Sequence, residues 1–341
     1  MLIHRIIFPE ANQAALVEDT INDELAPDQV LIRTAYTTIS AGTERANITG
    51  NPNVAGVAAP KVVFPRWCGY SSAGVVLKVG PAVTRVQPGD KVIGYWSTHA
   101  NYNLLPEKHV VRIADEGLSL REAAAIFICT FPLAAIRKTR LELGEACMVM
   151  GLGLLGQFAV RLAHVAGAVP VIGVDPVASR REDALAGGAD YVLDPFMEGF
   201  AQHVKALTGG GVNAAIEVTG QGAGLDETLD CMARFGRVAL LGCTRSKEFT
   251  IDYYRKVHCP GITLIGAHTN ARPENESHPG WFTHEDDLKA LMRLCASGRL
   301  NVKAMLSELH EPGECDAVYQ RLIHDKDFPM AVQFDWTKEE A

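Results

Sequence analysis

The sequence predicts an α/β protein in which a doubly wound parallel sheet is inserted in a β-rich domain. Three observations support this prediction. Strand-like runs separated by turns fill residues 1–120, strand and helix patterns alternate over residues 121–267, and the remainder returns toward strand and loop. A chain of 341 residues also exceeds what one hydrophobic core usually supports, which favours two domains.

The β-rich domain is expected to combine residues 1–120 with residues 268–341. Its first part has apolar runs at 30–35, 74–79 and 91–94, separated by turn signals such as Gly80-Pro81 and Pro88-Gly89. Short strands at irregular spacing are typical of a partly closed barrel. Its second part has one clear helical pattern, at 285–297, and then strand and loop.

The parallel-sheet domain is expected to span residues 121–267. It opens with a mostly helical segment, 121–139, which Pro132 should interrupt. Helical patterns at 157–166 and 180–186 then lie between strands, and strand-like runs occur at 146–150, 169–175, 191–193, 214–218, 236–241 and 262–266. This alternation is the signature of a parallel sheet with helices on both faces.

Charge and composition argue against several classes of function. The net charge is −8 and no run of Lys or Arg occurs, which disfavours nucleic-acid and anionic-membrane partners. The first residues show no leader-peptide pattern, and no apolar run approaches the roughly 20 residues of a membrane span. The eight cysteines form no C-x-x-C pair, which argues against a disulfide framework. We expect a cytoplasmic protein that acts on a small-molecule substrate.

A glycine-rich turn predicts a dinucleotide site. Residues 151–156 read Gly-Leu-Gly-Leu-Leu-Gly, which matches G-x-G-x-x-G between an apolar strand and a helix. Gly151 permits the tight turn, Gly153 lets the backbone approach a pyrophosphate, and Gly156 lets the helix pack closely on its strand. The N-terminus of the helix then presents N–H groups to the phosphates. This is the pattern of a Rossmann domain.

The acidic residue after the next strand predicts which nucleotide binds. Asp175 lies 19 residues past Gly156, where its carboxylate can accept hydrogen bonds from ribose hydroxyls and repel a 2′-phosphate, which favours NAD. Arg180 and Arg181 could instead meet a phosphate or form a solvated helix face. The residues that we expect to bind the cofactor are Gly151, Gly153, Leu154, Leu155, Gly156, Asp175, Arg180, Val218, Thr219, Gly242, Cys243, Gly266 and Ala267.

Together with this turn, four further segments make the chain resemble the medium-chain dehydrogenase/reductase superfamily. They are residues 69–76 (the family's G-H-E-x-x-G-x-V), 86–92 (V-x-x-G-D-x-V), 99–102 (H-A-E-Y) and 217–220. The resemblance covers nearly the whole chain. It implies a GroES-like β domain, built from both ends of the chain, around a Rossmann domain, and a homodimer or homotetramer.

The chain departs from the family at the zinc ligands. Zinc-containing members have a cysteine in a C-G-T-D element, whereas here residues 39–44 read Ile-Ser-Ala-Gly-Thr-Glu. The histidine and glutamate of G-H-E are Tyr70 and Ser71, whose hydroxyls are poor zinc ligands. The four cysteines of the structural-zinc lobe are also absent. We expect both metals to be lost, as in a branch similar to bacteriochlorophyllide and sugar or cyclitol dehydrogenases.

Without zinc, a side chain must exchange the proton of the substrate oxygen. The catalytic candidates are Tyr70, His99, Ser40 and Glu44. Tyr70 could bond a substrate hydroxyl or merely fill the space of the metal. Glu44 could act as a base or pair with Arg45 or Arg66, and His99 could be catalytic or structural.

Polar and aromatic residues elsewhere suit a polyhydroxylated substrate. The candidates for substrate binding are Thr43, Tyr254, His258, His268 and Trp281; a polar surface or subunit contact is the alternative for the last four. The sequence therefore predicts NAD-dependent interconversion of an alcohol and a ketone or aldehyde on a sugar- or cyclitol-like substrate. Quinone or activated-alkene reduction, and non-catalytic NAD binding, are the alternatives.

Overall fold

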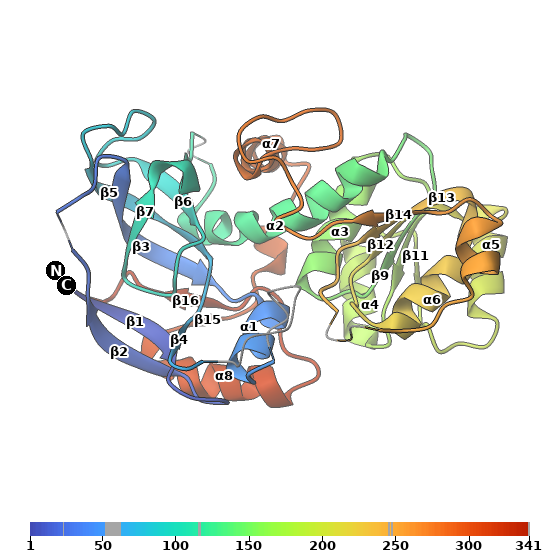
Figure 1. Cartoon of the computed structure of the whole chain (residues 1–341), viewed down its shortest axis with the longest axis horizontal. Coiled ribbons are helices and arrows are strands. Elements are labelled where there is room, and N and C mark those ends of the chain that lie inside the picture. The colour runs from blue at the N-terminus through green and yellow to red at the C-terminus, as the bar shows by residue number, and fades with distance from the viewer. Residues whose placement is uncertain (23, 52–62, 115–116, 245, 247, 340–341) are drawn as a thin grey trace. The chain divides into compact units, whose positions relative to one another are not determined.

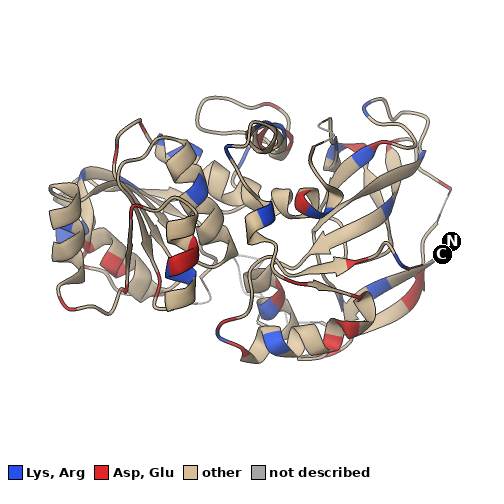
Figure 2. Cartoon of the chain, turned by 180° about the vertical axis from the view of Figure 1, so that it is seen from behind, with Lys and Arg blue, Asp and Glu red and all other residues tan. Residues whose placement is uncertain are grey.

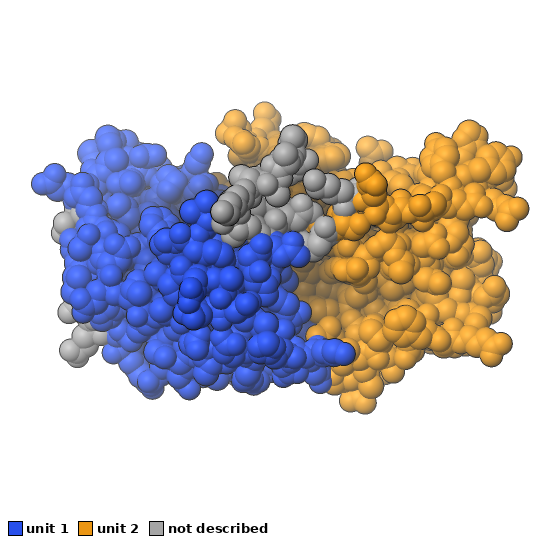
Figure 3. Space-filling view, turned by 60° about the horizontal axis from the view of Figure 1, so that its bottom comes forward, with its two compact units in different colours: residues 1–128, 288–341 blue, residues 129–287 orange. Residues whose placement is uncertain are grey.

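The structure is a computed structural model that describes residues 1–22, 24–51, 63–114, 117–244, 246 and 248–339. It divides into two units (Figure 3). The β-rich unit comprises Met1–Ile128 and Leu288–Ala341, and the parallel-sheet unit comprises Cys129–Asp287. The divisions fall within two helices, α2 (Leu120–Thr139) and α7 (His284–Ala296). The predicted α/β class, with a parallel sheet and a β-rich domain, is confirmed.

The described part of the β-rich unit forms two sheets. The smaller has the strand order β2-β1-β4, and the larger has the order β15-β16-β3-β5-β6-β8, with β7 also paired to β3. Strand β16 near the C-terminus pairs antiparallel with β3, so both ends of the chain build one sheet. The strands are β1 (Leu2–Phe8), β2 (Ala15–Thr20), β3 (Gln29–Thr38), β4 (Arg66–Trp67), β5 (Ser71–Val79), β6 (Lys91–Tyr95), β7 (Tyr102–Pro106), β8 (Val110–Arg112), β15 (Leu309–His310) and β16 (Gln333–Asp335).

Two helices, α1 (Ala41–Ile48) and α8 (Cys315–His324), complete the β-rich core. The expectation of only strand and loop after α7 was wrong, because α8 follows it. Its apolar residues Val318, Tyr319 and Leu322 recur at helical spacing and are buried against strand residues such as Phe8 and Phe334. Short 3₁₀ turns lie at Glu107–His109, Lys303–Met305 and Pro312–Glu314.

In the parallel-sheet unit, the described residues form six parallel strands in the order β11-β10-β9-β12-β13-β14. Helices α3 (Leu154–Val165) and α4 (Ala178–Ala186) cover one face, and α5 (Phe200–Thr208) and α6 (Gly222–Asp230) cover the other (Figure 1). The order reverses between β9 and β12, and ligands bind at such a switch point. The strands are β9 (Cys147–Met150), β10 (Val171–Val174), β11 (Tyr191–Leu193), β12 (Val212–Glu217), β13 (Met232–Leu240) and β14 (Thr263–Gly266).

Helix α2 runs through Pro132 without a break, so the expected interruption was wrong. Proline removes one backbone donor and crowds the preceding turn. The helix persists because its apolar residues, from Ala123 to Cys129, are completely buried, and that burial outweighs the missing hydrogen bond.

Basic and acidic residues are interspersed along the chain in both units (Figure 2). Among the described residues, none of the helices combines the length and the apolar character that crossing a membrane requires.

Candidate functional site

The glycine turn lies where β9 meets α3. Gly151 has a φ of +97°, and a Cβ on Gly156 would come within 1.9 Å of the Gly151 carbonyl oxygen. Gly156 therefore allows a contact between turn and helix that any side chain would prevent. In contrast, among the described residues, a Cβ on Gly153 would meet nothing within 4 Å, and no side chain caps the α3 N-terminus. The turn is open where a pyrophosphate would have to approach.

Asp175, just after β10, is tied to this turn. Its carboxylate accepts hydrogen bonds from the amides of Leu152 at 2.8 Å and Val177 at 2.9 Å. The Arg180 guanidinium lies 3.8 Å from the same carboxylate, and Arg181 donates to the Asp175 carbonyl oxygen at 2.7 Å. Both arginines thus contact Asp175, and both are half-buried.

The loops after β12 and β13 pack together beside the turn. A Cβ on Gly242 would lie 2.3 Å from the Gly220 amide nitrogen, so the two loops are in direct contact. Glu217 is buried and accepts hydrogen bonds from the amides of Thr219 at 2.8 Å and Gly220 at 3.2 Å. Burial raises the pKa of Glu217. Val218 and Thr219 are half-buried, as the rim of a binding site would be.

The segment after β14 joins the same edge of the sheet. Gly266 ends the strand, Ala267 is buried, and His268 is exposed. The side chain of His268 is hydrogen-bonded to that of Cys243, which raises the pKa of His268. The expected cofactor residues at the ends of five strands are thus neighbours at one edge of the sheet.

In the β-rich unit, Tyr70 and Ser40 form a hydroxyl pair. The Tyr70 phenol donates to Ser40 Oγ, and the ring is half-buried. It packs against Trp96 at 5.7 Å and Phe127 at 5.9 Å between ring centroids. Trp96 has a φ of +56°, a rare conformation for an aromatic residue, and it donates its backbone N–H to the Tyr70 carbonyl. No sequence pattern indicated that Trp96 would support Tyr70.

Glu44 and His99 lie in the interior beneath this pair. Glu44 Oε1 accepts from the Ser40 amide at 2.8 Å, and Oε2 lies 3.0 Å from His99 Nε2 and accepts from the Tyr319 hydroxyl. The other nitrogen of His99, Nδ1, lies 2.6 Å from Thr37 Oγ1. Both side chains are almost completely buried, at 1% and 0% exposure. They orient the backbone of Ser40 and do not reach solvent.

The alternative in which Glu44 pairs with Arg45 or Arg66 was wrong. The Arg66 guanidinium donates to Asn47 Oδ1 at 2.7 Å, and Arg45 Nε donates to the carbonyl oxygen of Leu322 at 2.6 Å. The carboxylate instead faces inward from α1 because α8, which the sequence did not reveal, brings Tyr319 to it.

The hydroxyl groups in the family's two zinc-ligand segments are engaged in hydrogen bonds. The Ser71 hydroxyl donates to the Ala124 carbonyl at 2.6 Å, and those of Tyr70 and Ser40 bond one another. A different set has suitable chemistry: Glu44, Cys68 and His99 each offer a ligand atom, all within 4.8 Å of one another. This set is a candidate metal site.

Several contacts bear on whether that set would hold catalytic zinc. Glu44 and His99 bond one another, Cys68 Sγ donates to the Ile6 carbonyl at 3.3 Å, and all three side chains are buried. Burial and the neighbouring Glu44 charge raise the pKa of Cys68 well above its usual value, whereas zinc binds the thiolate. A catalytic zinc also needs a position open to substrate.

The five expected substrate residues are distributed over both units. In the β-rich unit, Thr43 is exposed on α1. In the parallel-sheet unit, Tyr254 and His258 stack on each other in a short π-helical segment, η2 (Tyr254–His258), and both are exposed. Trp281 is half-buried, and its ring lies 4.6 Å from the Lys138 ammonium, a contact that the sequence did not indicate.

Comparisons with known proteins agree with this arrangement. The family model for the alcohol dehydrogenase GroES-like domain matches residues 26–115, and that for a zinc-binding dehydrogenase matches residues 155–279. The chain is 27% identical over 240 residues to D-guloside 3-dehydrogenase of Escherichia coli, covering 70% of this chain and 68% of the relative. It is 27% identical over 319 residues to L-threonine 3-dehydrogenase of Pyrococcus horikoshii, covering 84% and 85%.

A solved structure shows the same fold over the full length. The benzyl alcohol dehydrogenase of Acinetobacter calcoaceticus superposes with a TM-score of 0.84 at 20% identity, covering 98% of this chain and 99% of that one. The two family models match the two kinds of domain that the structure contains, one in each unit. The chain therefore belongs to the zinc-type medium-chain alcohol dehydrogenase superfamily.

Proposed function

We propose that this dehydrogenase uses NAD to interconvert a secondary alcohol and a ketone, or an alcohol and an aldehyde, on a sugar- or cyclitol-like substrate. The observation that carries the proposal is the Tyr70–Ser40 hydroxyl pair: Tyr70 stands where zinc-containing members have the histidine of G-H-E, and Ser40 directly precedes the segment that matches C-G-T-D. The relatives named for guloside and threonine oxidation support CH–OH chemistry.

The preference for NAD rests on Asp175. Members of the family use a nicotinamide cofactor, and the uncapped α3 N-terminus with an open Gly153 suits its pyrophosphate. The Asp175 carboxylate is held in place by two backbone amides, so it is a fixed acceptor for ribose hydroxyls. Arg180 beside it partly offsets its charge, but a carboxylate at that position still disfavours a 2′-phosphate.

Tyr70 is the residue that we assign to the substrate oxygen. The bound nicotinamide supplies the hydride acceptor. The Tyr70 phenol already donates to Ser40 Oγ, so its oxygen can accept a hydrogen bond from a substrate hydroxyl. As the hydride leaves, the alcohol proton passes to the Tyr70 oxygen, the phenol proton to Ser40 Oγ, and the Ser40 hydroxyl proton to solvent water. Glu44 and His99 are positioning residues, since Glu44 holds the Ser40 amide and His99 holds Glu44.

We further propose that the reaction runs without catalytic zinc. Tyr70 and Ser71 stand at the histidine and glutamate positions of G-H-E, and their hydroxyls are engaged in hydrogen bonds. The Glu44–Cys68–His99 set has metal-binding chemistry, but its atoms are bonded within the core and closed to substrate.

Nicotinamide absorbance tests the proposal directly. Purified protein is mixed with NAD or NADP and a panel of sugars, cyclitols and simple alcohols. We expect NAD to be reduced by one or more polyols, and NADP much more slowly. Reduction of quinones or activated alkenes by NAD(P)H, with a silent polyol panel, would contradict the proposal.

The protein is also proposed to form a homodimer or homotetramer. Strand β14 lies at the edge of the six-stranded sheet, and Leu264 on it is 38% exposed. An exposed apolar edge strand is a surface that a second copy can extend.

A further inference from the structure

We propose that Lys138 is a positioning residue for the cofactor, whose ammonium group clamps the segment from Gly266 to Trp281 in its nucleotide-binding form. This inference rests on the proposed function, because that segment carries the expected ligand positions Gly266, Ala267, His268 and Trp281. All of the residues concerned belong to the parallel-sheet unit.

Lys138 contacts the segment at three places. Its Nζ donates to the carbonyl oxygens of Gly266 at 3.1 Å and Ala271 at 2.5 Å, and it lies 4.6 Å from the centroid of the Trp281 ring. The residue is only 6% exposed, so these contacts substitute for water around the charge. One side chain on α2 therefore fixes the start, middle and end of a segment with little regular structure.

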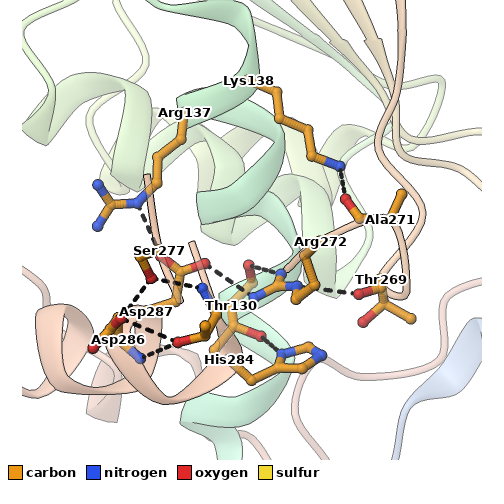
Figure 4. A network of polar contacts seen from close by, with 11 residues as sticks. Thr130, Arg137, Lys138, Thr269, Ala271, Arg272, Ser277, His284, Asp286 and Asp287 are labelled. Atoms are coloured by element: carbon orange, nitrogen blue, oxygen red, sulfur yellow. Dashed lines mark hydrogen bonds and ion pairs between the residues drawn. The ribbon is translucent and has the colours of Figure 1, made fainter. Parts of the chain in front are cut away.

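A second anchor fixes the same segment without depending on pH. Arg272 donates to the buried Asp287 at 3.1 Å and to the Thr130 carbonyl at 3.1 Å, while Arg137 donates to the other Asp287 oxygen at 2.9 Å (Figure 4). Arginine stays charged at any working pH, so this anchor persists. The contacts that Lys138 makes with Gly266 and Trp281 are not part of this second anchor. Gly266 and Trp281 are themselves expected ligand positions.

Lys138 can change charge near the working pH. Burial, together with the neighbouring Arg272 charge, lowers the pKa of Lys138 to about 8, against the opposing effect of Asp287. His268 also interacts with Lys138 electrostatically and is hydrogen-bonded to Cys243. Loss of the proton removes the attraction to the Trp281 ring and weakens both hydrogen bonds to carbonyls. Lys138 is therefore mostly charged at pH 7 and mostly neutral at pH 9, so the clamp weakens as the pH rises through about 8.

The test is NADH binding, followed by the fluorescence of bound NADH, for wild type, Lys138→Met and Lys138→Arg at pH 7 and 9. Exposed Lys205 on α5 offers a matched control, Lys205→Met, which removes the same charge from the same unit. At pH 7 we expect Lys138→Met to weaken NADH binding about ten-fold, as for loss of charged hydrogen bonds, and Lys205→Met to leave it unchanged.

The pH dependence separates a clamp from a general packing role. If the uncharged form binds about ten-fold more weakly, linkage predicts that wild-type affinity falls about five-fold from pH 7 to pH 9. Lys138→Arg keeps its charge, so its affinity should change less than about two-fold over that range. The comparison of wild type with Lys138→Arg therefore tests the clamp even if Lys138→Met folds poorly.

Two results would overturn the clamp but leave the proposed function intact. One is that Lys138→Met binds NADH at pH 7 as tightly as wild type does. The other is that wild type and Lys138→Arg lose the same affinity for NADH between pH 7 and pH 9. Wild-type protein that binds no nicotinamide nucleotide at either pH would overturn the proposed function, and the clamp with it.

Discussion

Replacing Gly153 by alanine is expected to impair cofactor binding without impairing folding. Gly153 has φ −68° and ψ −172°, which alanine adopts freely, and its Cβ would meet nothing within 4 Å. Alanine at a helix N-cap lowers the free energy of unfolding by about 0.5 kcal/mol or more relative to better caps. Alanine also has less conformational freedom than glycine in the unfolded chain, which raises the free energy of unfolding by about 0.4–1 kcal/mol. The two effects oppose each other, so the free energy of unfolding should change by no more than about 0.5 kcal/mol.

The same methyl group would occupy the space that the pyrophosphate needs. We expect NADH to bind about 10–100-fold more weakly, which corresponds to about 1.4–2.7 kcal/mol. Fluorescence titration measures this loss, and urea unfolding measures stability on the same preparation.

Gly156→Ala is the matched variant with the opposite outcome. Its Cβ would lie 1.9 Å from the Gly151 oxygen, whereas a Cβ atom almost never lies closer than 3.0 Å to another heavy atom. The turn would therefore have to open by about 1.1 Å, the difference between 3.0 and 1.9 Å. Such overpacking costs about 1–3 kcal/mol of stability. Gly153→Ala with wild-type NADH affinity, or Gly156→Ala with wild-type stability, would refute this account of the turn.

The remaining predictions concern the charge beside the turn, the reacting hydroxyl and the edge strand. Asp175→Asn keeps one oxygen that can accept a backbone hydrogen bond but removes the negative charge. The ratio of kcat/KM with NAD to kcat/KM with NADP should therefore fall about ten-fold, and an unchanged ratio would contradict the assignment of Asp175 to the ribose. Tyr70→Phe should lower kcat on the order of 100-fold while NADH affinity stays within about two-fold, and an unaltered kcat would exclude Tyr70 from the chemistry. Leu264→Lys should convert the oligomer to smaller species in light scattering, and a monomeric wild type would show the assembly proposal to be wrong.

The parallel sheet could be predicted because its signals are local. Each strand is a short apolar run, and the glycine pattern states the backbone requirements of one turn within six residues. A Cβ on Gly156 would lie 1.9 Å from the Gly151 oxygen, so glycine is sterically required at this position of the pattern. Interruption at Pro132 was expected on equally local grounds, but burial of the surrounding helix decided the outcome.

The β-rich site could be predicted only in part, because distant segments build it. The bond between Glu44 and Tyr319 joins residues 275 positions apart, and it requires α8, whose short helical pattern gains meaning only from what it packs against. The left-handed backbone of Trp96 and the burial of His99 likewise depend on the completed core. The sequence suggested Tyr70 and Ser40 as candidates but did not predict the hydrogen bond between them.

The most direct test of the central claim is the rate of NAD reduction by metal-depleted protein. The protein is dialysed against a strong chelator, its zinc content is measured by elemental analysis, and the rate with the best polyol is recorded before and after zinc is restored. The account predicts a full rate with substoichiometric zinc and no gain on adding it. A rate that disappears with the metal and returns with one zinc per chain would contradict it, and would assign the metal to the Glu44–Cys68–His99 set.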